Sequence, residues 1–492
     1  MKQQDFKELC DACDNVLLED DSVSRVAISW LHILKWDPGF LEKYNSLFLE
    51  INMRERARLF LLLLRYSGIS LIRIIKGIWV RGFYVNKNLQ KCESDFLFIS
   101  HLINKELIDK KNDFYFGDIP DDLNSFGYSS SIAMINHIGI KNYLIPEAFN
   151  KEFPRKIVML KSLSFFIEVK IYYFQILEAL KLLIKRNKNN LHNRISKEAA
   201  IQALSNTTAN NLRLKIQISD LVRHVKPRFI MLTYEGHAWE RLIFSEVRKI
   251  DPTIRCIGYQ HALIKQQHAI YRDLGHNYDP DIIATSGVID LDNLENKSKN
   301  TKIIKVNIGS SKKFLRASSY NHKDKLETTT CLVLADGNLK ESSRILSFAS
   351  DLARLNPNVH FIFRLHPASD KKTLLKNNPA LNKSKSNIIW SYSSLEEDFE
   401  MSNLALYRGT NAIFVAASYN VLPIFYGSER STAIDPLSDI ADIRISINET
   451  NQFFDILEAM DSTHYNELIK KILKYCNVKY SDLNIESLIR VL

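Results

Sequence analysis

The alternation of short apolar runs with longer amphipathic stretches is the clearest pattern in the chain. From Ser94 onward the apolar runs end in polar or small residues, which is typical of buried strands in a parallel sheet. The first set of expected strands comprises residues 95–103, 228–235, 254–261 and 281–287. Helical periodicity lies between them, most clearly over 165–186 and 211–226. The pattern predicts parallel α/β construction.

A second set of expected strands follows a polar break over 291–302, which its composition predicts to be a linker. These strands comprise residues 331–337, 359–367, 387–392, 404–409, 421–427 and 443–448. We therefore predict a helical N-terminal segment over 1–93, followed by two Rossmann-like domains over 94–298 and 299–492. Ligands of such sheets bind outside the carboxyl ends of the strands, so we expect a site in a central cleft between the domains.

Residues 56–83 form the segment that most resembles a membrane span. Arg65, Arg73 and Lys76 interrupt it, so no uncharged run reaches the roughly 18 to 20 residues that a spanning helix needs. At about 100° per residue, five basic residues fall within one arc opposite a Leu/Ile face: Arg54, Arg58, Arg65, Arg73 and Lys76. A core helix with a solvated basic stripe is the favoured interpretation. The alternative is peripheral contact with an anionic membrane through residues 54–83.

The charge of the chain indicates the kind of partner, and its cysteine content indicates the compartment. The net charge of +10 favours an anionic partner, either a phosphate-bearing substrate, nucleic acid or an anionic membrane surface. The basic residues are dispersed and most aromatic residues lie in apolar runs, which argues against nucleic acid. Six scattered cysteines and the lack of a signal-peptide pattern favour the cytoplasm. Cys10 and Cys13 have no second ligand pair at suitable spacing, so we expect no metal site.

Two strand ends carry candidate chemistry. In "FRLHP", Pro367 keeps His366 extended, and Arg364 points to the same side two residues earlier. In "MLTYEGHAWERLIF" (231–244), Glu235 and Gly236 occupy the turn that follows a strand. A carboxylate at that position can act as a general base, although acids at helix starts are often only caps.

The same alternatives apply to Glu240 on the first helical turn, which is a weaker catalytic candidate than Glu235. His261 ends another expected strand in "GYQHALI". A single histidine of this kind is more often structural than catalytic. We retain Gly236, Glu240 and His261 as candidate acceptor or cleft residues.

Two further turns are suited to anion binding. "ADGNLKES" (335–342) and "RGTNAIF" (408–414) place small and polar residues between a strand and a helix N-terminus, where backbone amides attract phosphate. Their candidate donor-binding residues are Gly337, Asn338, Gly409, Thr410 and Asn411. The chain contains neither G-x-G-x-x-G nor G-x-x-x-x-G-K-[ST], which argues against a dinucleotide oxidoreductase or a P-loop ATPase.

The ordered set Glu235-Gly236, His366-Pro367 and Thr410-Asn411 resembles the acid-Gly, His-Pro and Ser/Thr motifs of a known family. These are bacterial GT-B-fold glycosyltransferases of capsule and O-antigen biosynthesis that use CMP-activated sugars, including sialyltransferases and Kdo transferases. "GYQH" and the ending "RGTNAIFVAASYNVLPIFYG" extend the resemblance, which covers roughly residues 94–450. Sialyltransferases of this type tend to carry two acids before the glycine, where this chain has Tyr234 and Glu235.

The resemblance implies an α/β GT-B fold and transfer of a Kdo-like or sialic-acid-like sugar from a CMP donor. His366 would contact the donor phosphate, with Arg364, Pro367 and the Thr410 turn beside it. Glu235 would be the base for a hydroxyl of a glycan or lipid-linked glycan. We expect no metal or other cofactor, because histidine, arginine and helix amides can neutralise a leaving phosphate. The expected location is the cytoplasm, and the alternative is a peripheral position on the cytoplasmic face of the inner membrane.

Several alternatives remain open at this point. The donor could instead be a UDP-sugar, a GDP-sugar or a CDP-alcohol, and the same fold also serves nucleotide-sugar epimerases. A non-catalytic basic binding protein is the third class. Metal-dependent transferases are expected to offer an acidic pair at a strand end. Here Asp121-Asp122 and Glu396-Glu397 are more simply explained as turn and first-turn residues.

Overall fold

The chain folds into two compact units, which the computed structural model describes except for short stretches. Those stretches are residues 1–2, 21, 35–40, 49–52, 87–92, 109, 142–143, 147–148, 150–152, 185–189, 262–267, 312–328, 368, 383–385, 428–434 and 460–461. Unit 1 comprises Met1–Lys312 and Ser481–Leu492, and unit 2 comprises Lys313–Tyr480.

Within its described residues, unit 1 contains a seven-stranded parallel sheet with the order β3-β2-β1-β4-β5-β6-β7. The strands are β1 (Phe96–Leu102), β2 (Ser130–Asn136), β3 (Arg155–Val158), β4 (Phe229–Thr233), β5 (Arg255–Gln260), β6 (Ile282–Thr285) and β7 (Ile304–Asn307). The four strands expected from the sequence are confirmed as β1, β4, β5 and β6. The other three were not expected, because β3 and β7 are short and β2 begins with two serines.

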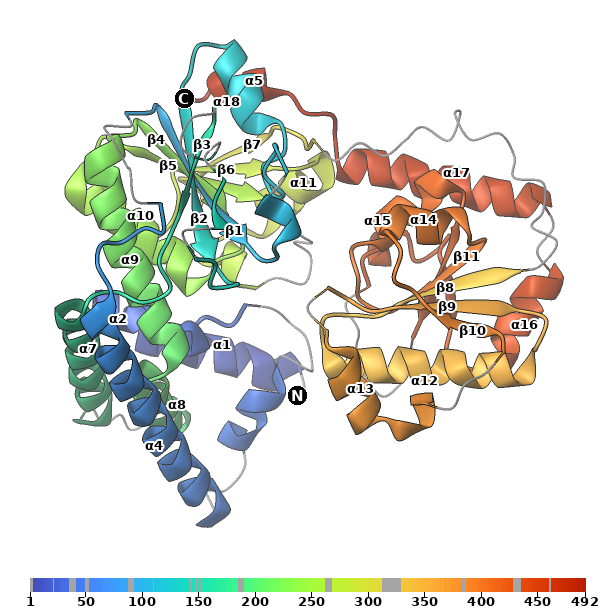
Figure 1. The fold of residues 1–492 in the computed structure, drawn as a ribbon, viewed down its shortest axis with the longest axis horizontal. Helices are drawn as coiled ribbons and strands as arrows, with labels where there is room; N and C mark the ends of the chain where they lie inside the picture. The colour runs from blue at the N-terminus through green and yellow to red at the C-terminus, as the bar shows by residue number, and fades with distance from the viewer. Residues whose placement is uncertain are drawn as a thin grey trace. The chain divides into compact units, whose positions relative to one another are not determined.

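Helices cover both faces of this sheet (Figure 1). The helices of unit 1 are α1 (Gln3–Leu18), α2 (Val23–Val26), α4 (Met53–Lys76), α5 (Ile119–Ser125), α7 (Phe165–Ile184), α8 (Asn190–Ala203), α9 (Asn206–Val225), α10 (Ala238–Ile250), α11 (Val288–Lys297) and α18 (Ile485–Ile489). Because strand side chains alternate, Leu97 and Ile99 pack with α9 and α10, whereas Phe96 and Phe98 pack with α5 and α18.

The first ninety residues share a core with later helices. Side chains of α1, α2 and the segment that follows them pack with those of α7, α8 and α9 in one buried cluster. Arg25 of α2 also pairs with Glu178 of α7 at 2.7 Å, and both side chains are buried. The segment expected over 1–93 is helical, but it belongs to unit 1.

The boundary between the two units lies at Lys312/Lys313 and not at the predicted position 298/299. The expected linker over 291–302 contains the end of α11 and leads into β7, which pairs with β6. The C-terminal residues return to unit 1, where the Ser481 amide donates to the Ser286 carbonyl at 3.0 Å and α18 covers the sheet. The sequence pattern did not predict β7, because this edge strand is only partly buried and therefore lacks a continuous apolar run.

Within its described residues, unit 2 has a six-stranded parallel sheet with the order β10-β9-β8-β11-β12-β13. Its strands are β8 (Thr330–Leu334), β9 (His360–Arg364), β10 (Ile388–Trp390), β11 (Leu404–Tyr407), β12 (Leu422–Tyr426) and β13 (Ile445–Ile447). All six coincide with strands expected from the sequence.

The helices of unit 2 are α12 (Leu339–Leu355), α13 (Lys371–Asn377), α14 (Leu395–Glu400), α15 (Ile413–Ala416), α16 (Thr450–Ala459) and α17 (Ser462–Lys479). Helix α12 covers one face of the sheet, and α15 and α17 cover the other (Figure 1). Short 3-10 turns complete both units: η1 (Ser29–Leu31), η2 (Glu42–Phe48), η3 (Gly77–Trp79), η4 (Glu106–Ile108), η6 (Ala269–Tyr271), η8 (Pro379–Asn382), η9 (Ala417–Tyr419) and η10 (Ser438–Ile440).

Both sheets have the strand order of a Rossmann fold, 3-2-1-4-5-6, with β7 added at the edge in unit 1. The expected α/β class with two Rossmann-like units is therefore confirmed. In such sheets the order reverses at a switch point, which lies between β1 and β4 in unit 1 and between β8 and β11 in unit 2. Ligands of open α/β sheets bind at the carboxyl ends of these strands.

Helix α4 differs from the favoured expectation of a core helix. Its Leu/Ile face is exposed at Leu61 and Ile72, whereas Arg58 and Arg73 contact Glu198 and Asn210 of unit 1. The side chain of Arg54 lies outside the described residues. In the described part of the chain, no helix is both long enough and apolar enough to cross a bilayer.

Candidate active site

The turn after β4 is organised by one buried carboxylate. The backbone amides of Glu235, Gly236 and His237 donate to Oε2 of Glu240, at 3.0, 2.8 and 2.7 Å. Glu240 is buried on the first turn of α10, and burial raises the pKa of its carboxyl to about 7. The cap interpretation therefore fits Glu240, because its carboxylate bonds the amides that precede and begin the helix.

Glu235 occupies a different environment five residues earlier. Its side chain is partly exposed, and its Oε2 lies 3.4 Å from Nε2 of His237. The carboxylate is thus open to solvent on one side and next to a titratable imidazole on the other. This is an environment in which a carboxylate can exchange protons with a bound hydroxyl.

Gly236 is required by the backbone at this turn. Its φ is +85°, and a Cβ atom would lie 2.6 Å from the backbone carbon of Ala269. Left-handed φ and a backbone neighbour at that distance both exclude a larger residue without distortion. In the acid-Gly pair, Glu235 is thus the candidate catalytic residue and Gly236 is the residue that allows the turn to form.

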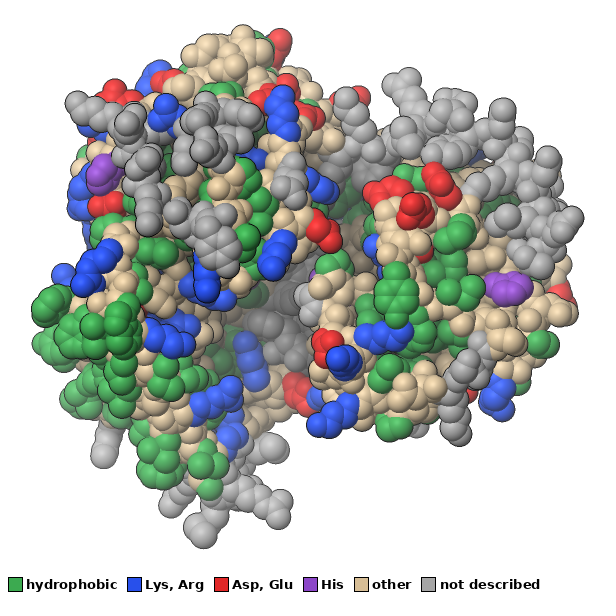
Figure 2. Space-filling view, in the orientation of Figure 1, with side chains coloured by type: hydrophobic (Ala, Val, Ile, Leu, Met, Phe, Trp, Pro, Cys, Tyr) green, Lys and Arg blue, Asp and Glu red, His purple; other side chains and the backbone are tan. Residues whose placement is uncertain are grey.

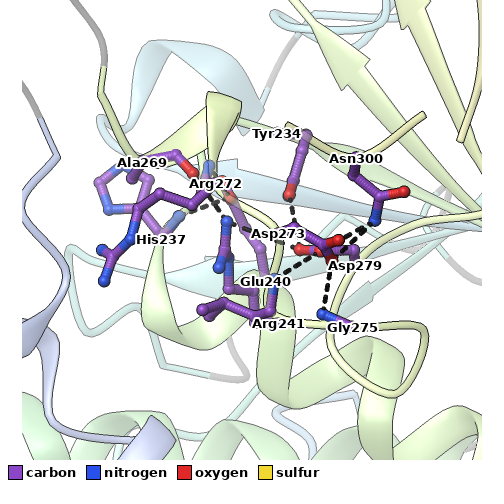
Figure 3. A network of polar contacts seen from close by, with 12 residues as sticks. Tyr234, His237, Glu240, Arg241, Ala269, Arg272, Asp273, Gly275, Asp279 and Asn300 are labelled. Atoms are coloured by element: carbon purple, nitrogen blue, oxygen red, sulfur yellow. Dashed lines mark hydrogen bonds and ion pairs between the residues drawn. The ribbon is translucent and has the colours of Figure 1, made fainter. Parts of the chain in front are cut away.

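A buried polar network supports the turn from the core side (Figure 3). Arg241 of α10 donates to the carbonyl of Ala269 at 2.7 Å and lies 3.6 Å from the Asp279 carboxylate. The hydroxyl of Tyr234 donates to the same carboxylate at 3.5 Å, and the amide of Leu274 donates to it at 2.8 Å. These contacts fix the segment against which Gly236 packs, so the position of Glu235 depends on the core behind it.

Two histidines that the sequence analysis did not select lie at the same edge of the sheet. His101 at the end of β1 has Nδ1 3.0 Å from Nε2 of His137, and Nε2 3.3 Å from Oγ1 of Thr233. The contact with Thr233 joins β1 to β4 across the switch point of unit 1. Burial and the neighbouring His137 lower the pKa of His101 to about 3, and burial also lowers the pKa of His137. Both imidazoles are therefore neutral near pH 7.

Aromatic rings surround this histidine pair. The ring of His101 lies 5.3 Å from that of Tyr115 and 5.2 Å from that of Trp239, and Tyr115 lies 5.1 Å from His261. Burial, with the carboxylates of Asp113 and Glu235 nearby, raises the pKa of Tyr115 to about 12. The predicted residue His261 thus joins one cluster with Glu235 and His101. Histidines at the ends of β1 and β2 were the sequence signal that could have identified this cluster.

In unit 2, His366 follows β9 and faces the turn that follows β8. A Cβ atom added to Gly337 would lie 3.4 Å from Nδ1 of His366, so the imidazole lies against this turn. The Ser369 amide donates to the His366 carbonyl at 2.8 Å, which closes a turn around Pro367. The structure therefore brings together His366 and Gly337, which the sequence analysis selected separately.

Arg364 has a structural partner. Its Nη1 donates to the buried Asp398 carboxylate at 2.5 Å and to the Ser393 carbonyl at 2.8 Å. Ser391 also donates to Asp398, at 2.6 Å. The ion pair compensates the charge of Arg364, so this residue adds less positive potential to the strand end than an unpaired arginine would.

The amides at the start of α12 already have partners. The Asn338 side chain accepts from the amides of Lys340 and Glu341 at 2.9 and 3.4 Å, and the Asp336 carboxylate accepts from the Asn338 amide at 2.9 Å. A phosphate at this terminus would have to replace these bonds. Asn338 therefore acts as a helix cap in the structure.

The turn after β11 lies beside the turn after β8, because β8 and β11 are neighbouring strands. Thr410 accepts from the Ala412 amide at 3.3 Å, and Phe414 donates to the Asn411 carbonyl at 3.2 Å. Buried Arg408, next to Gly409, forms an ion pair with Glu341 of α12. The following helix α15 spans only Ile413–Ala416, so the helix dipole expected here is weak.

The acidic pairs and cysteines have structural positions. Asp121 and Asp122 lie in the first turn of α5, and Glu397 forms a capping box with Ser394 at the start of α14. Cys10 and Cys13 are buried in α1, and burial raises the pKa of Cys10 to about 12. Among the described residues, no group of three or more His, Cys, Asp or Glu side chains is arranged to hold a metal ion.

Two cavities lie apart from the predicted residues. One of about 330 Å³ is lined by Ser343, Arg344, Ser347, Phe348, Asp351 and Tyr426 in unit 2. The other, of about 320 Å³, lies in unit 1 between the end of α1 and residues 274–278. Neither cavity is lined by a predicted site residue, so the candidate site rests on the strand ends.

Comparison with known proteins gives distant structural likeness only. No protein-family model and no curated protein sequence matches the chain. A glycotransferase of kitacinnamycin has a TM-score of 0.45 and 9% identity, over 79% of this chain and 96% of that chain. The lipopolysaccharide outer core galactosyltransferase WaaB has a TM-score of 0.45 and 11% identity, over 80% and 98%. UDP-GlcNAc 2-epimerase from Neisseria meningitidis has a TM-score of 0.44 and 12% identity, over 80% and 99%.

Replacing Gly236 with alanine should destabilise unit 1, because alanine would meet both an unfavourable φ and the backbone of Ala269. We expect a loss of about 2 kcal/mol or more in the free energy of unfolding. Gly127→Ala is the matched control, since Gly127 has a φ of +84° but no heavy atom within 4 Å of the added Cβ. The control should lose only the stability associated with the unfavourable φ, about 1 to 2 kcal/mol. Equal losses in urea unfolding would contradict the close-contact explanation.

Proposed function

We propose that this protein is a glycosyltransferase of bacterial surface polysaccharide that transfers a CMP-activated ulosonic acid to a glycan hydroxyl. The observation that carries the proposal is the position of Glu235. Its carboxylate follows β4 at the switch point of a Rossmann-type sheet, is partly exposed, and belongs to a turn fixed by Glu240.

The proposed reaction uses Glu235 as a general base. Glu235 accepts the proton of the acceptor hydroxyl while the hydroxyl oxygen forms a bond to the anomeric carbon of the donor sugar. The bond between that carbon and the phosphate oxygen breaks, and CMP leaves with the bonding electron pair. His237, 3.4 Å from Glu235, is placed to receive or share the proton afterwards.

The neutral histidine pair is suited to the acceptor. A neutral imidazole has one N–H donor and one acceptor nitrogen, so it can bond a sugar hydroxyl in either sense. Tyr115 and Trp239 add flat apolar surfaces beside His101. This combination supports a carbohydrate ligand at the unit 1 edge, where Glu235 also lies.

The unit 2 edge is suited to a single phosphate. His366 lies against the Gly337 turn, while Arg364 and Arg408 are each paired with an acid. A site with little uncompensated positive charge fits the one phosphate of a CMP-sugar better than the diphosphate of a UDP-sugar, for which a metal or more cations would be expected. This supports His366 as the main group that stabilises the leaving phosphate.

Glu235→Gln should reduce transfer by about 100-fold or more, since the amide cannot accept the hydroxyl proton. The thermal unfolding temperature should stay near that of the wild type, because the side chain is partly exposed. Release of CMP from CMP-Kdo or CMP-sialic acid in the presence of a glycan acceptor measures the rate. Exposed Glu106→Gln is the matched control and should retain full activity. Retention of more than about a tenth of the turnover by Glu235→Gln would exclude the general-base role.

His366→Ala should weaken the binding of CMP and slow transfer. A ligand at about 100 times its Kd stabilises a protein by about 2.7 kcal/mol, so CMP should raise the unfolding temperature of the wild type and much less that of the variant. Exposed His464→Ala in the same unit serves as control. Arg364→Ala should also weaken binding, but it should lower stability too, because buried Asp398 loses its partner. Unchanged CMP affinity in His366→Ala would remove His366 from the donor site.

Transfer should persist in EDTA, and CMP should inhibit it more strongly than the other nucleoside monophosphates do. The physical reason is that the proposed phosphate contacts come from protein groups and not from a metal ion. Initial rates with and without chelator, together with inhibition by CMP, UMP, UDP and GDP, test both points. Activity that disappears with EDTA and returns with Mg²⁺, with stronger inhibition by UDP or GDP, would contradict the CMP-donor assignment.

A further inference from the structure

Helix α7 buries two acidic residues beside its apolar core positions and exposes several large apolar residues. Glu168 pairs with Arg213 at 2.7 Å, Glu178 pairs with Arg25 at 2.7 Å, and all four side chains are buried. On the opposite side, Phe166 is 81% exposed and Ile184 is 78% exposed. A helix that packs only within a globular protein exposes mainly polar side chains.

Helix α4 and the turn η3 extend the exposed apolar face. Leu61 is 64% exposed and Trp79 is 73% exposed, and Ile72 between them is also exposed. The two elements adjoin α7, since a Cβ atom on Gly77 of η3 would lie 2.8 Å from the amide nitrogen of Phe165. The α4–α7 surface is defined by Leu61, Ile72, Trp79, Phe166, Tyr173 and Ile184. Figure 2 shows hydrophobic side chains gathered over both helices.

The exposed charges around the α4–α7 surface have one sign. Among the described side chains of 57–81 and 161–184, the exposed charged ones are Arg65, Lys76, Arg81, Lys161, Lys170 and Lys181. The two acids in these segments, Glu168 and Glu178, are buried in ion pairs. Figure 2 shows lysine and arginine side chains beside the apolar ones. The face therefore combines exposed apolar and aromatic side chains with uncompensated positive charge.

We propose that the α4–α7 surface docks on an anionic membrane, with its apolar side chains among the acyl chains and its basic side chains at the lipid phosphates. Apolar area removed from water and electrostatic attraction to anionic lipid both favour this position. Trp79 and Tyr173 are of the types enriched at membrane interfaces. A second copy of the chain is a poorer partner, because two such surfaces would bring like charges together.

The proposed docking surface starts next to the candidate acceptor site. Lys161, four residues before α7, donates from Nζ to the carbonyl of His137 at 2.8 Å. His137 in turn contacts His101. The docking surface and the proposed acceptor site therefore belong to the same unit, and both lie near the loop that follows β2. The docking itself does not depend on the transfer reaction.

Sedimentation with lipid vesicles tests the proposal on the full chain without nucleotide sugar, so its outcome is separable from that of the transferase assays. The vesicles are phosphatidylcholine alone, or phosphatidylcholine with about one third phosphatidylglycerol, a fraction that gives a strong negative surface potential. We expect the wild type to sediment with the anionic vesicles and much less with the neutral ones. Added salt should weaken the binding, because it screens the basic side chains.

Two double variants separate the apolar and electrostatic contributions. Trp79→Asp with Phe166→Asp should reduce binding to anionic vesicles by at least about tenfold, and Lys170→Glu with Lys181→Glu by a similar factor. Phe126→Asp is the matched control, because Phe126 is an exposed aromatic residue elsewhere in unit 1, and it should bind as the wild type does. All the substituted side chains are exposed, so the unfolding temperatures should change little.

Wild-type protein that stays in the supernatant with anionic vesicles would overturn the proposal. So would α4–α7 variants that sediment as the wild type does. A third outcome would also contradict the proposal: the wild type does not bind vesicles but is a dimer in solution, and the Trp79→Asp, Phe166→Asp double variant is a monomer. The α4–α7 surface would then be a self-association face and not a membrane-docking face.

Discussion

The carboxylate of Glu240 determines the geometry on which the candidate site of unit 1 depends. It accepts three consecutive backbone amides, and these bonds hold the turn in which Glu235 and Gly236 lie. Buried amides without partners would be costly, so the turn requires an acceptor at this point. Two acids five residues apart thus have different environments: Glu240 is buried and bonded to the backbone, and Glu235 is partly exposed beside His237. Only Glu235 therefore has the environment expected of a general base.

Parallel sheet topology brings the remaining candidate residues together. His101 and Thr233 are 132 residues apart in the sequence, yet their side chains approach to 3.3 Å because β1 and β4 are neighbours in the sheet. In unit 2 the paired strands β8 and β9 place Gly337 against His366 in the same way. Each unit therefore collects residues from distant segments at one edge of its sheet. Loops at this edge can vary while the strands keep the geometry.

Buried ion pairs determine which side of α7 faces the core. Removing one partner of a buried pair typically costs about 3 to 5 kcal/mol, so Arg213 and Arg25 strongly favour the orientation in which Glu168 and Glu178 point inward. Phe166, Tyr173 and Ile184 are then left on the exposed side. The same reasoning applies to Arg364, whose pairing with Asp398 changes its expected contribution to anion binding.

The sequence by itself determined the strands with strong apolar runs and the residues that follow them. It predicted β4, β9 and β11 and selected Glu235, His366 and Thr410, because buried parallel strands and the polar residues at their ends are local features of the chain. Tertiary structure alone decided three matters: the pairing of β7 and α18 with unit 1, the joining of His101 to His137, and the exposure of α4 and α7. Each depends on contacts between residues far apart in the sequence, and a local pattern contains no information about which partner satisfies a polar group or covers an apolar face.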